Sequence, residues 1–299
     1  MNRIILCRRI LLRIALTTVL LVLASPAALA RAPAVEAVRE ALQKPDAEAA
    51  VKLGERAIAA LPRDADAWYY AGQAYGRMAI EVSMLRKASW ASKTRDAFQK
   101  AVSLDPDHLG AREGLVQFYS MAPAIMGGGK DKATAEANAF ATRNPAGGHY
   151  LRAMTLEGAS AERELRTAVR LAPNESRYRG ALVMLLDRSK RSTDALAAIE
   201  AGLARKPDDV RMLYMLGRHA ALHGQRTDVG LAALDRLLAK PAGSLEDISV
   251  AGAHWRRGQL REKQGLTSEA LVDYRRAVAL APRLADAKKD LARLAAQRK

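Results

Sequence analysis

The 299-residue chain has very little cysteine and few aromatic residues. Its one cysteine, Cys7, precedes an apolar N-terminal run, so a chain without that segment has no thiol. This excludes disulfides, zinc-thiolate sites and cysteine nucleophiles there, and leaves packing to supply the stability. Aromatic residues make up 5% of the chain and show no tryptophan cluster, which argues against a dedicated sugar-binding site.

The sequence also lacks strand patterns and catalytic motifs. No segment alternates strictly between apolar and polar residues, and no G-x-S-x-G motif occurs. His219 and His223 stand four residues apart, but Ala220 replaces the glutamate of a metalloprotease helix, and no third ligand is evident from the sequence. We interpret this pair as surface or helix-end histidines. We expect no enzymatic activity, no cofactor and no metal site.

Residues 1–30 have the pattern of a cleaved signal peptide. Four arginines precede an apolar run over residues 14–24, and Ala28-Leu29-Ala30 matches the pattern that signal peptidases accept. The run is shorter than the roughly 20 residues that cross a bilayer as a helix, so we expect cleavage before Arg31 and no transmembrane segment afterwards. The pair Arg8-Arg9 also resembles a twin-arginine signal, but the general secretory route is favoured. We therefore expect an exported, periplasmic protein.

The charge is strongly positive, with 48 basic and 32 acidic residues and a formal net charge of +16. Cleavage of residues 1–30, which hold four arginines and no acid, would leave +12. An exported basic protein meets anionic envelope surfaces or acidic proteins rather than nucleic acid. Because the basic residues are spread along the chain, a solvated helical surface is the simpler interpretation.

Proline spacing reveals an internal repeat. Seven prolines each follow a helical apolar pattern, and two successive spacings are 34 residues, the period of helix-turn-helix repeats. The other spacings of 44, 39, 28 and 41 residues indicate the same unit with insertions or one shortening. The prolines that end the predicted units are Pro62, Pro106, Pro145, Pro173, Pro207, Pro241 and Pro282.

Residues within the units match a known repeat pattern. The last unit carries six matches at fixed offsets: Gly258, Gly265, Ala270, Tyr274, Ala277 and Pro282. An earlier unit has Trp68, Gly72 and Tyr75 and then, after a ten-residue insertion, Phe98, Ala101 and Pro106. From Asp46 to Pro282 the chain thus resembles the tetratricopeptide repeat family, in its exported bacterial type.

That resemblance implies an all-α, right-handed helix-turn-helix solenoid of about seven helix pairs with a C-terminal capping helix. We assign residues 31–62 to a degenerate N-terminal pair, residues 63–282 to the repeats and residues 283–299 to the capping helix. The segment from Ala122 to Ala133, which contains Gly127-Gly128-Gly129, departs from the repeat. It does not match a phosphate-binding loop. We interpret it as a glycine hinge capped by Asp131. The alternative is that its backbone amides bind an anion at the start of the next helix.

The resemblance also implies a concave groove lined by fixed positions of the first helix of each pair. These positions combine arginines with aromatic residues, a composition that suits an acidic or carboxylate-terminated segment. The leading hypothesis is a non-catalytic scaffold for a protein or peptide partner, and the alternative is a small-ligand protein of a transport system. The helix edges or loops are the other candidate surface. The predicted groove residues are Tyr69, Gln73, Arg77, Gln117, Arg152, Arg177, Arg211, Tyr214, Arg218, Trp255 and Gln259.

Overall fold

The computed structural model describes residues 32–44, 46–245 and 248–297. The predicted signal peptide in residues 1–30 lies outside this part of the chain. The described residues from Ala34 onward form one compact, helical unit that contains no strand. None of the described helices is both long and apolar enough to span a bilayer.

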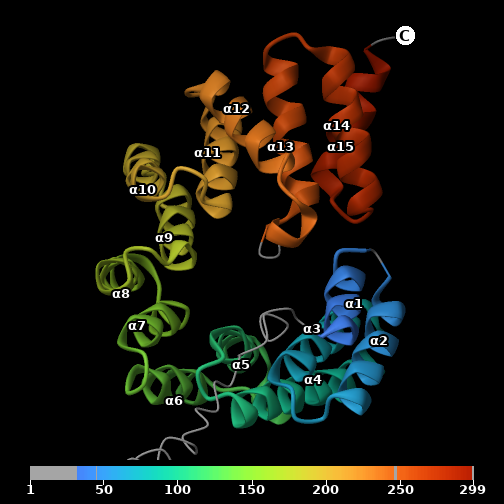
Figure 1. Ribbon diagram of the computed structural model, residues 1–299, viewed down its shortest axis with the longest axis vertical. Helices are drawn as coiled ribbons and strands as arrows, with labels where there is room; N and C mark the ends of the chain where they lie inside the picture. Colours follow the sequence, from blue (N-terminus) through green and yellow to red (C-terminus); the bar gives the residue numbers. More distant parts are fainter. Residues whose placement is uncertain (1–31, 45, 246–247, 298–299) are drawn as a thin grey trace, which may run out of the picture. The chain divides into compact units, whose positions relative to one another are not determined.

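The described residues form fifteen α-helices and two short 3-10 helices, joined by turns and loops (Figure 1). They are α1 (Pro33–Leu42), α2 (Ala47–Ala60), α3 (Ala65–Glu81), α4 (Met84–Leu104), α5 (Leu109–Met121), η2 (Ala124–Met126), α6 (Lys130–Ala141), α7 (Pro145–Ala153), α8 (Gly158–Leu171), α9 (Ser176–Arg188), α10 (Ser192–Arg205), α11 (Val210–His223), α12 (Thr227–Leu238), η3 (Ala242–Leu245), α13 (Val250–Lys263), α14 (Thr267–Leu280) and α15 (Ala285–Ala296).

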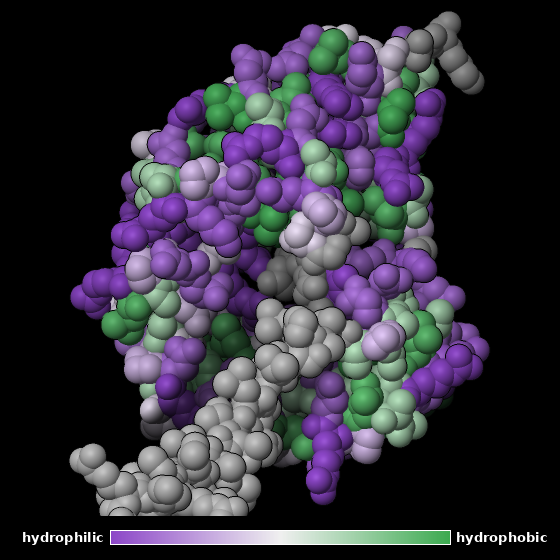
Figure 2. Space-filling model, in the orientation of Figure 1, coloured by the Kyte–Doolittle hydropathy of each residue, from purple (hydrophilic) through white to green (hydrophobic). Residues whose placement is uncertain are grey.

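Consecutive helices pack as pairs, from α3 on α4 through α13 on α14, and each pair contacts the next. Helix α15 packs on α14 through Leu294, which contacts the cluster around Leu271 and Tyr274. The predicted all-α solenoid is therefore confirmed, with six packed pairs from α3 to α14, α1 and α2 before them and α15 as the final helix. The visible face is largely hydrophilic, as expected of stacked pairs that bury their apolar faces against neighbours (Figure 2).

The repeat prolines stand where the units were expected to end. Helix α2 ends at Ala60 before Pro62, α14 ends at Leu280 before Pro282, and the five units between them end in the same way. Pro145 is itself the first residue of α7, a position where its missing N–H costs nothing. Proline thus separates each unit from the next because it cannot continue the preceding helix.

A side chain six residues after the proline often bonds back to the proline's carbonyl. Trp68 Nε1 donates to Pro62 O at 3.0 Å, and Arg112 Nε donates to Pro106 O at 2.8 Å. Arg179 Nη2 makes the same contact with Pro173 O at 3.3 Å. These bonds satisfy turn carbonyls that lie beyond the end of the preceding helix.

Close helix approach within a pair depends on glycine. A Cβ on Gly258 of α13 would lie 2.6 Å from Tyr274 Cε1 of α14, and a Cβ on Gly72 of α3 would lie 2.7 Å from Phe98 Cε1 of α4. Tyr274 is fully buried in the space that this glycine leaves. The large ring on one helix therefore packs directly against the backbone of the other.

The ten-residue insertion lengthens helices instead of forming a loop. Helix α3 has 17 residues and α4 has 21, and the two are joined by Val82 and Ser83. The extended ends leave Ile80, Met84 and Leu85 strongly exposed. The insertion thus adds apolar surface next to the repeat core.

The glycine segment between α5 and α6 is a tight turn. Gly127 has a φ of 89°, and a Cβ on Gly128 would lie 1.8 Å from Ala122 O, so only glycine fits there. The prediction that Asp131 caps the following helix is wrong. Helix α6 begins at Lys130 with Gly129 as its N-cap, and no side chain makes the capping bond.

The final helix is fixed by an ion-pair network. Arg293 of α15 donates from both terminal nitrogens to Glu262 of α13 at 2.6 and 2.8 Å, and the Tyr274 hydroxyl donates to the same carboxylate at 2.8 Å. The hydrogen bonds from Arg293 lower the pKa of Glu262, against the opposing effect of burial. The C-terminal helix is therefore held by charge as well as by its apolar face.

We predict that Gly258→Leu destabilises the protein by about 1–3 kcal/mol, because the added side chain overlaps Tyr274. Urea denaturation followed by circular dichroism measures this change. Arg275→Leu, on the exposed face of α14, is the control and should change the stability by less than about 0.5 kcal/mol. An unchanged unfolding midpoint for Gly258→Leu would contradict the packing described here.

We also predict a pH-dependent effect of Arg293→Met. The folded-state pKa of Glu262 lies below its ordinary value of 4.5, so the pair stabilises the fold above that pH and stops doing so as the pH falls through the folded pKa. The melting temperature of the variant should thus be lower than wild type at pH 7, with a difference that shrinks toward pH 3. Lys289→Met, an exposed position of α15, should show no such pH dependence.

Candidate partner-binding groove

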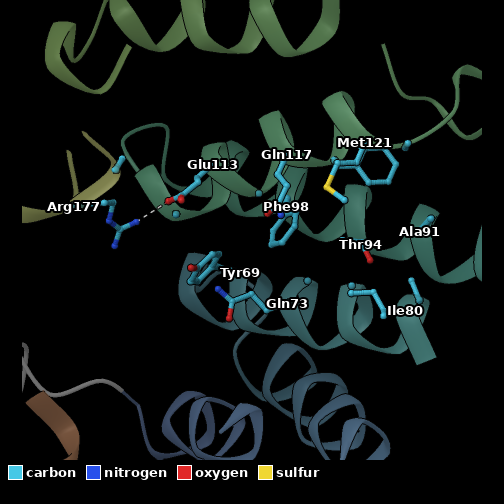
Figure 3. Close-up of a pocket in the computed structure, with 18 of the residues that line it drawn as sticks. Tyr69, Gln73, Ile80, Ala91, Thr94, Phe98, Glu113, Gln117, Met121 and Arg177 are labelled. Atoms are coloured by element: carbon cyan, nitrogen blue, oxygen red, sulfur yellow. Dashed lines mark hydrogen bonds and ion pairs between the residues drawn. The ribbon is translucent and has the colours of Figure 1, made fainter. Parts of the chain in front are cut away.

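A cavity of about 820 Å³ lies along α3, α4 and α5 and is named here the α3–α5 groove (Figure 3). Segments of η2, α7, α9 and α11 also contribute side chains to it. Its main lining residues are Tyr69, Gln73, Ile80, Lys87, Ala91, Thr94, Phe98, Glu113, Gln117, Phe118, Met121, Met126, Tyr150, Arg177, Met184, Arg211 and Met215.

The centre of the groove is aromatic. Phe98 lies between two glycines, because a Cβ on Gly72 or on Gly114 would each meet its ring within 3 Å. Tyr69 stands beside Phe98, with ring centroids 6.1 Å apart, and packs against His108 at 4.7 Å. The repeat packing that closes α3, α4 and α5 together therefore also forms the floor of the groove.

One end of the groove is apolar and exposed. Ile80 at the end of α3 has 78% of its surface exposed, and Met121 at the end of α5 has 75%. Met126, from the turn before α6, lines the same cavity. In Figure 3 the Ile80 and Met121 side chains lie at the end of the groove remote from Arg177. Exposed apolar side chains gathered in one groove are typical of an interaction site.

The opposite end is charged, and it joins three helices. Arg177 Nη1 of α9 donates to Glu113 Oε2 of α5 at 3.0 Å, and the Tyr150 hydroxyl of α7 donates to Glu113 Oε1 at 2.7 Å. Burial raises the pKa of the Tyr150 phenol, and the Glu113 charge raises it further. The phenol therefore stays protonated and donates a hydrogen bond at physiological pH.

Five of the eleven predicted residues meet in this groove. They are Tyr69, Gln73, Gln117, Arg177 and Arg211. They come from the first helices of four pairs, α3, α5, α9 and α11. Their side chains supply amide, phenol and guanidinium groups between the apolar and the charged ends.

The structure places the other six elsewhere. Arg77 lines a second cavity and donates to Leu42 O at 3.1 Å. Trp255 Nε1 and Gln259 Nε2 both donate to Asp290 of α15, at 2.8 and 3.1 Å. These three side chains therefore connect helices of the solenoid.

The remaining three predicted residues also make structural contacts. Arg152 Nε donates to Glu164 of α8 at 3.2 Å, and Arg218 donates to Asp187 of α9. Tyr214 is largely buried, which raises the pKa of its phenol. Together with the Arg177–Glu113 pair, these contacts neutralise much of the positive charge that the first-helix positions carry.

Sequence reasoning did not single out Ile80, Met121 or Met126. Ile80 lies beyond the repeat position where α3 would ordinarily finish, and Met126 lies in the glycine segment outside the repeat pattern. The available signal was the ten-residue insertion itself. A lengthened helix pair with apolar ends indicates added surface beside the groove.

The comparisons with known proteins support the fold. The yeast Tom70 crystal structure matches with a TM-score of 0.53 and 13% identity, over 89% of this chain and 57% of that one. A tetratricopeptide repeat protein from Parabacteroides merdae matches with a TM-score of 0.48 and 14% identity, over 88% and 99% of the two chains. The Cut9–Hcn1 hetero-tetramer of the APC/C gives a TM-score of 0.48 and 17% identity, over 87% and 48%.

This chain thus spans about half the length of the Cut9 and Tom70 chains that it matches. At these identities the likeness shows a tetratricopeptide-like fold, and that conclusion rests on the Tom70 match. No protein-family model and no curated protein matches the sequence.

We predict that Glu113→Ala destabilises the protein by about 1–3 kcal/mol, because it leaves the largely buried Tyr150 hydroxyl without its acceptor. Glu113→Gln should cost less, since its amide oxygen still accepts that hydrogen bond. Chemical denaturation of the two variants measures the difference. Equal losses of stability in both variants would mean that the negative charge of Glu113, and not its hydrogen bond with Tyr150, stabilises the fold.

Proposed function

We propose that the protein is a non-catalytic scaffold that binds a protein or peptide partner in the α3–α5 groove. The observation that carries this proposal is the pair of exposed apolar side chains, Ile80 and Met121, at one end of a groove whose other end is charged. Ordinary surfaces rarely gather such side chains in a hollow, because their contact with water is unfavourable. A partner that covers them removes that contact.

An extended segment suits the groove better than a compact small molecule. A site for a small molecule buries most of its ligand, and therefore has lining side chains that are themselves largely enclosed. Here Ile80 and Met121 are about three-quarters exposed. A peptide that places an apolar side chain between them and continues past Phe98 toward Arg177 uses the whole length of the groove.

The charged end of the α3–α5 groove indicates the charge of the partner. Arg177 and Arg211 line the groove there, and a guanidinium has five N–H donors, so Arg177 can hold Glu113 and a partner's carboxylate together. The net charge of +12 that remains after the expected cleavage attracts acidic partners over a longer range. We therefore propose an acidic or carboxylate-terminated segment.

We further propose that the protein works as an exported, periplasmic component of a bacterial envelope. Support comes from the sequence of residues 1–30, with its arginines, its apolar run and its Ala28-Leu29-Ala30 site. Contact of the basic surface with the anionic envelope is part of the same proposal.

A small-ligand function is the second candidate. One observation favours it: a cavity of about 820 Å³ falls within the roughly 300–1,000 Å³ range of pockets that hold small molecules. The two candidates differ in what binds the apolar end. A peptide needs Ile80 as a contact, whereas a small polar ligand bound near Arg177 does not.

We predict that Ile80→Lys abolishes capture of the partner, because it places a charge in the apolar end of the groove. The control is Leu85→Lys, an equally apolar and even more exposed position that does not line the groove. Cross-linking in the native cell, followed by purification from the envelope and mass spectrometry, measures the loss. Export is tested separately by the N-terminal sequence of the protein recovered from the envelope fraction. The proposed export and cleavage require that this sequence begin at Arg31.

Discrete proteins captured by wild type and by Leu85→Lys, but not by Ile80→Lys, would support the groove as the binding surface. The same proteins captured by all three would place binding elsewhere. Capture of none by wild type would favour the small-ligand candidate.

A further inference from the structure

We propose that Asp187, His219 and His223 form a binding site for a borderline transition-metal ion of the zinc type. The three side chains converge where α9 packs against α11, and each offers one donor atom. These atoms all lie within 4.8 Å of one another. The site is separate from the α3–α5 groove and does not depend on its proposed role.

The distances suit one shared ion. Asp187 Oδ1 is 3.3 Å from His223 Nε2 and 3.6 Å from His219 Nδ1. Ligands at about 2.0–2.2 Å from a tetrahedral zinc ion are separated by roughly 3.3–3.6 Å. The two distances from Asp187 therefore already match the spacing that a shared ion requires, and the donor atoms of the two histidines lie within 4.8 Å of each other. The two imidazole rings lie 4.5 Å apart between centroids, on successive turns of one helix.

His219 provides the second, independent observation. Its side chain is 1% exposed, so the interpretation of His219 as a surface histidine is wrong, and neither ring nitrogen makes a hydrogen bond with the described residues. Buried polar groups almost always have a partner, because an unsatisfied one loses its bonds to water without replacement. Nδ1 lies 3.6 Å from Asp187 Oδ1, a distance too long for a good hydrogen bond but suitable for a shared metal ion.

Arg218 holds the carboxylate in the orientation that the site needs. Its guanidinium donates to Asp187 Oδ2, whereas both histidines face Oδ1. Asp187 is itself 4% exposed and so cannot turn freely. A ligating carboxylate is commonly fixed through its other oxygen in this way. Arg218 is therefore a positioning residue.

The donor set selects the kind of metal. Two neutral imidazoles and one carboxylate suit zinc, nickel or copper, whereas magnesium and calcium prefer oxygen ligands alone. The His223 side chain is 26% exposed, which gives an ion a path from solvent and leaves a fourth position for water. Three protein ligands with one open position is also the arrangement of zinc sites that exchange ligands.

Other histidines of the described chain lack this convergence. His108 pairs with Asp66, and His254 pairs with Asp273, each without a second imidazole. His149 is the matched case, because it pairs with Glu164 beside Arg152 and thus reproduces the carboxylate and guanidinium with one histidine missing. It provides the control for the test.

The test is equilibrium dialysis of the untagged, full-length protein against Zn²⁺ in excess Mg²⁺, with Co²⁺ absorption as a report on coordination. Wild type should bind one Zn²⁺ per chain and give the intense visible bands of a tetrahedral Co²⁺ site. His223→Gln and Asp187→Asn should each weaken binding at least tenfold, and His149→Gln should bind as wild type does. Circular dichroism of each variant checks that its helices are intact.

Absence of bound Zn²⁺ in the wild type would overturn the proposal. So would equal affinity in wild type and His223→Gln, or an equal loss in His149→Gln. His223→Gln is the decisive variant if Asp187→Asn disturbs folding, because His223 lies at the partly exposed end of the cluster.

Discussion

The fold depends on the close approach of two helices at a position that admits no side chain. Gly72, Gly217 and Gly258 each stand where a Cβ would collide with a large residue of the partner helix. That large residue, Phe98, Leu234 or Tyr274, is buried because the glycine leaves room for it. Its burial supplies much of the apolar contact within a pair, and the stacked pairs cover the remaining apolar faces. The groove beside α3, α4 and α5 exists because Phe98 fixes their spacing.

Most of this architecture is predictable from the sequence, because it follows from local rules. Proline cannot continue a preceding helix, so Pro62 and Pro282 mark unit boundaries without knowledge of the fold. Glycine and aromatic residues at fixed offsets then predict which helices pack together. The prediction that Asp131 caps this helix was wrong, because the helix begins at Lys130 with Gly129 as its N-cap and no side chain makes the capping bond.

The site was less predictable, because its residues depend on packing between pairs. Repeat positions assign Tyr69 and Arg177 to one groove, and both line the same cavity, but these positions do not show that Glu113 and Tyr150 join Arg177 in one network. Ile80 lies on an insertion to which the repeat assigns no position. Asp187 likewise lies on another helix from His219, and only the contact of α9 with α11 brings it close. Such long-range contacts leave no periodic signal.

The central claim is that the α3–α5 groove is where a partner lies. A photoreactive amino acid at Gln117, an exposed residue of α5 that lines the groove, reports on this most directly in the native cell. The matched position is Ala135, exposed on α6 and outside the groove. The account predicts a discrete cross-linked protein from Gln117 and none from Ala135. Cross-linking from Ala135 alone, or the same products from both positions, would contradict it.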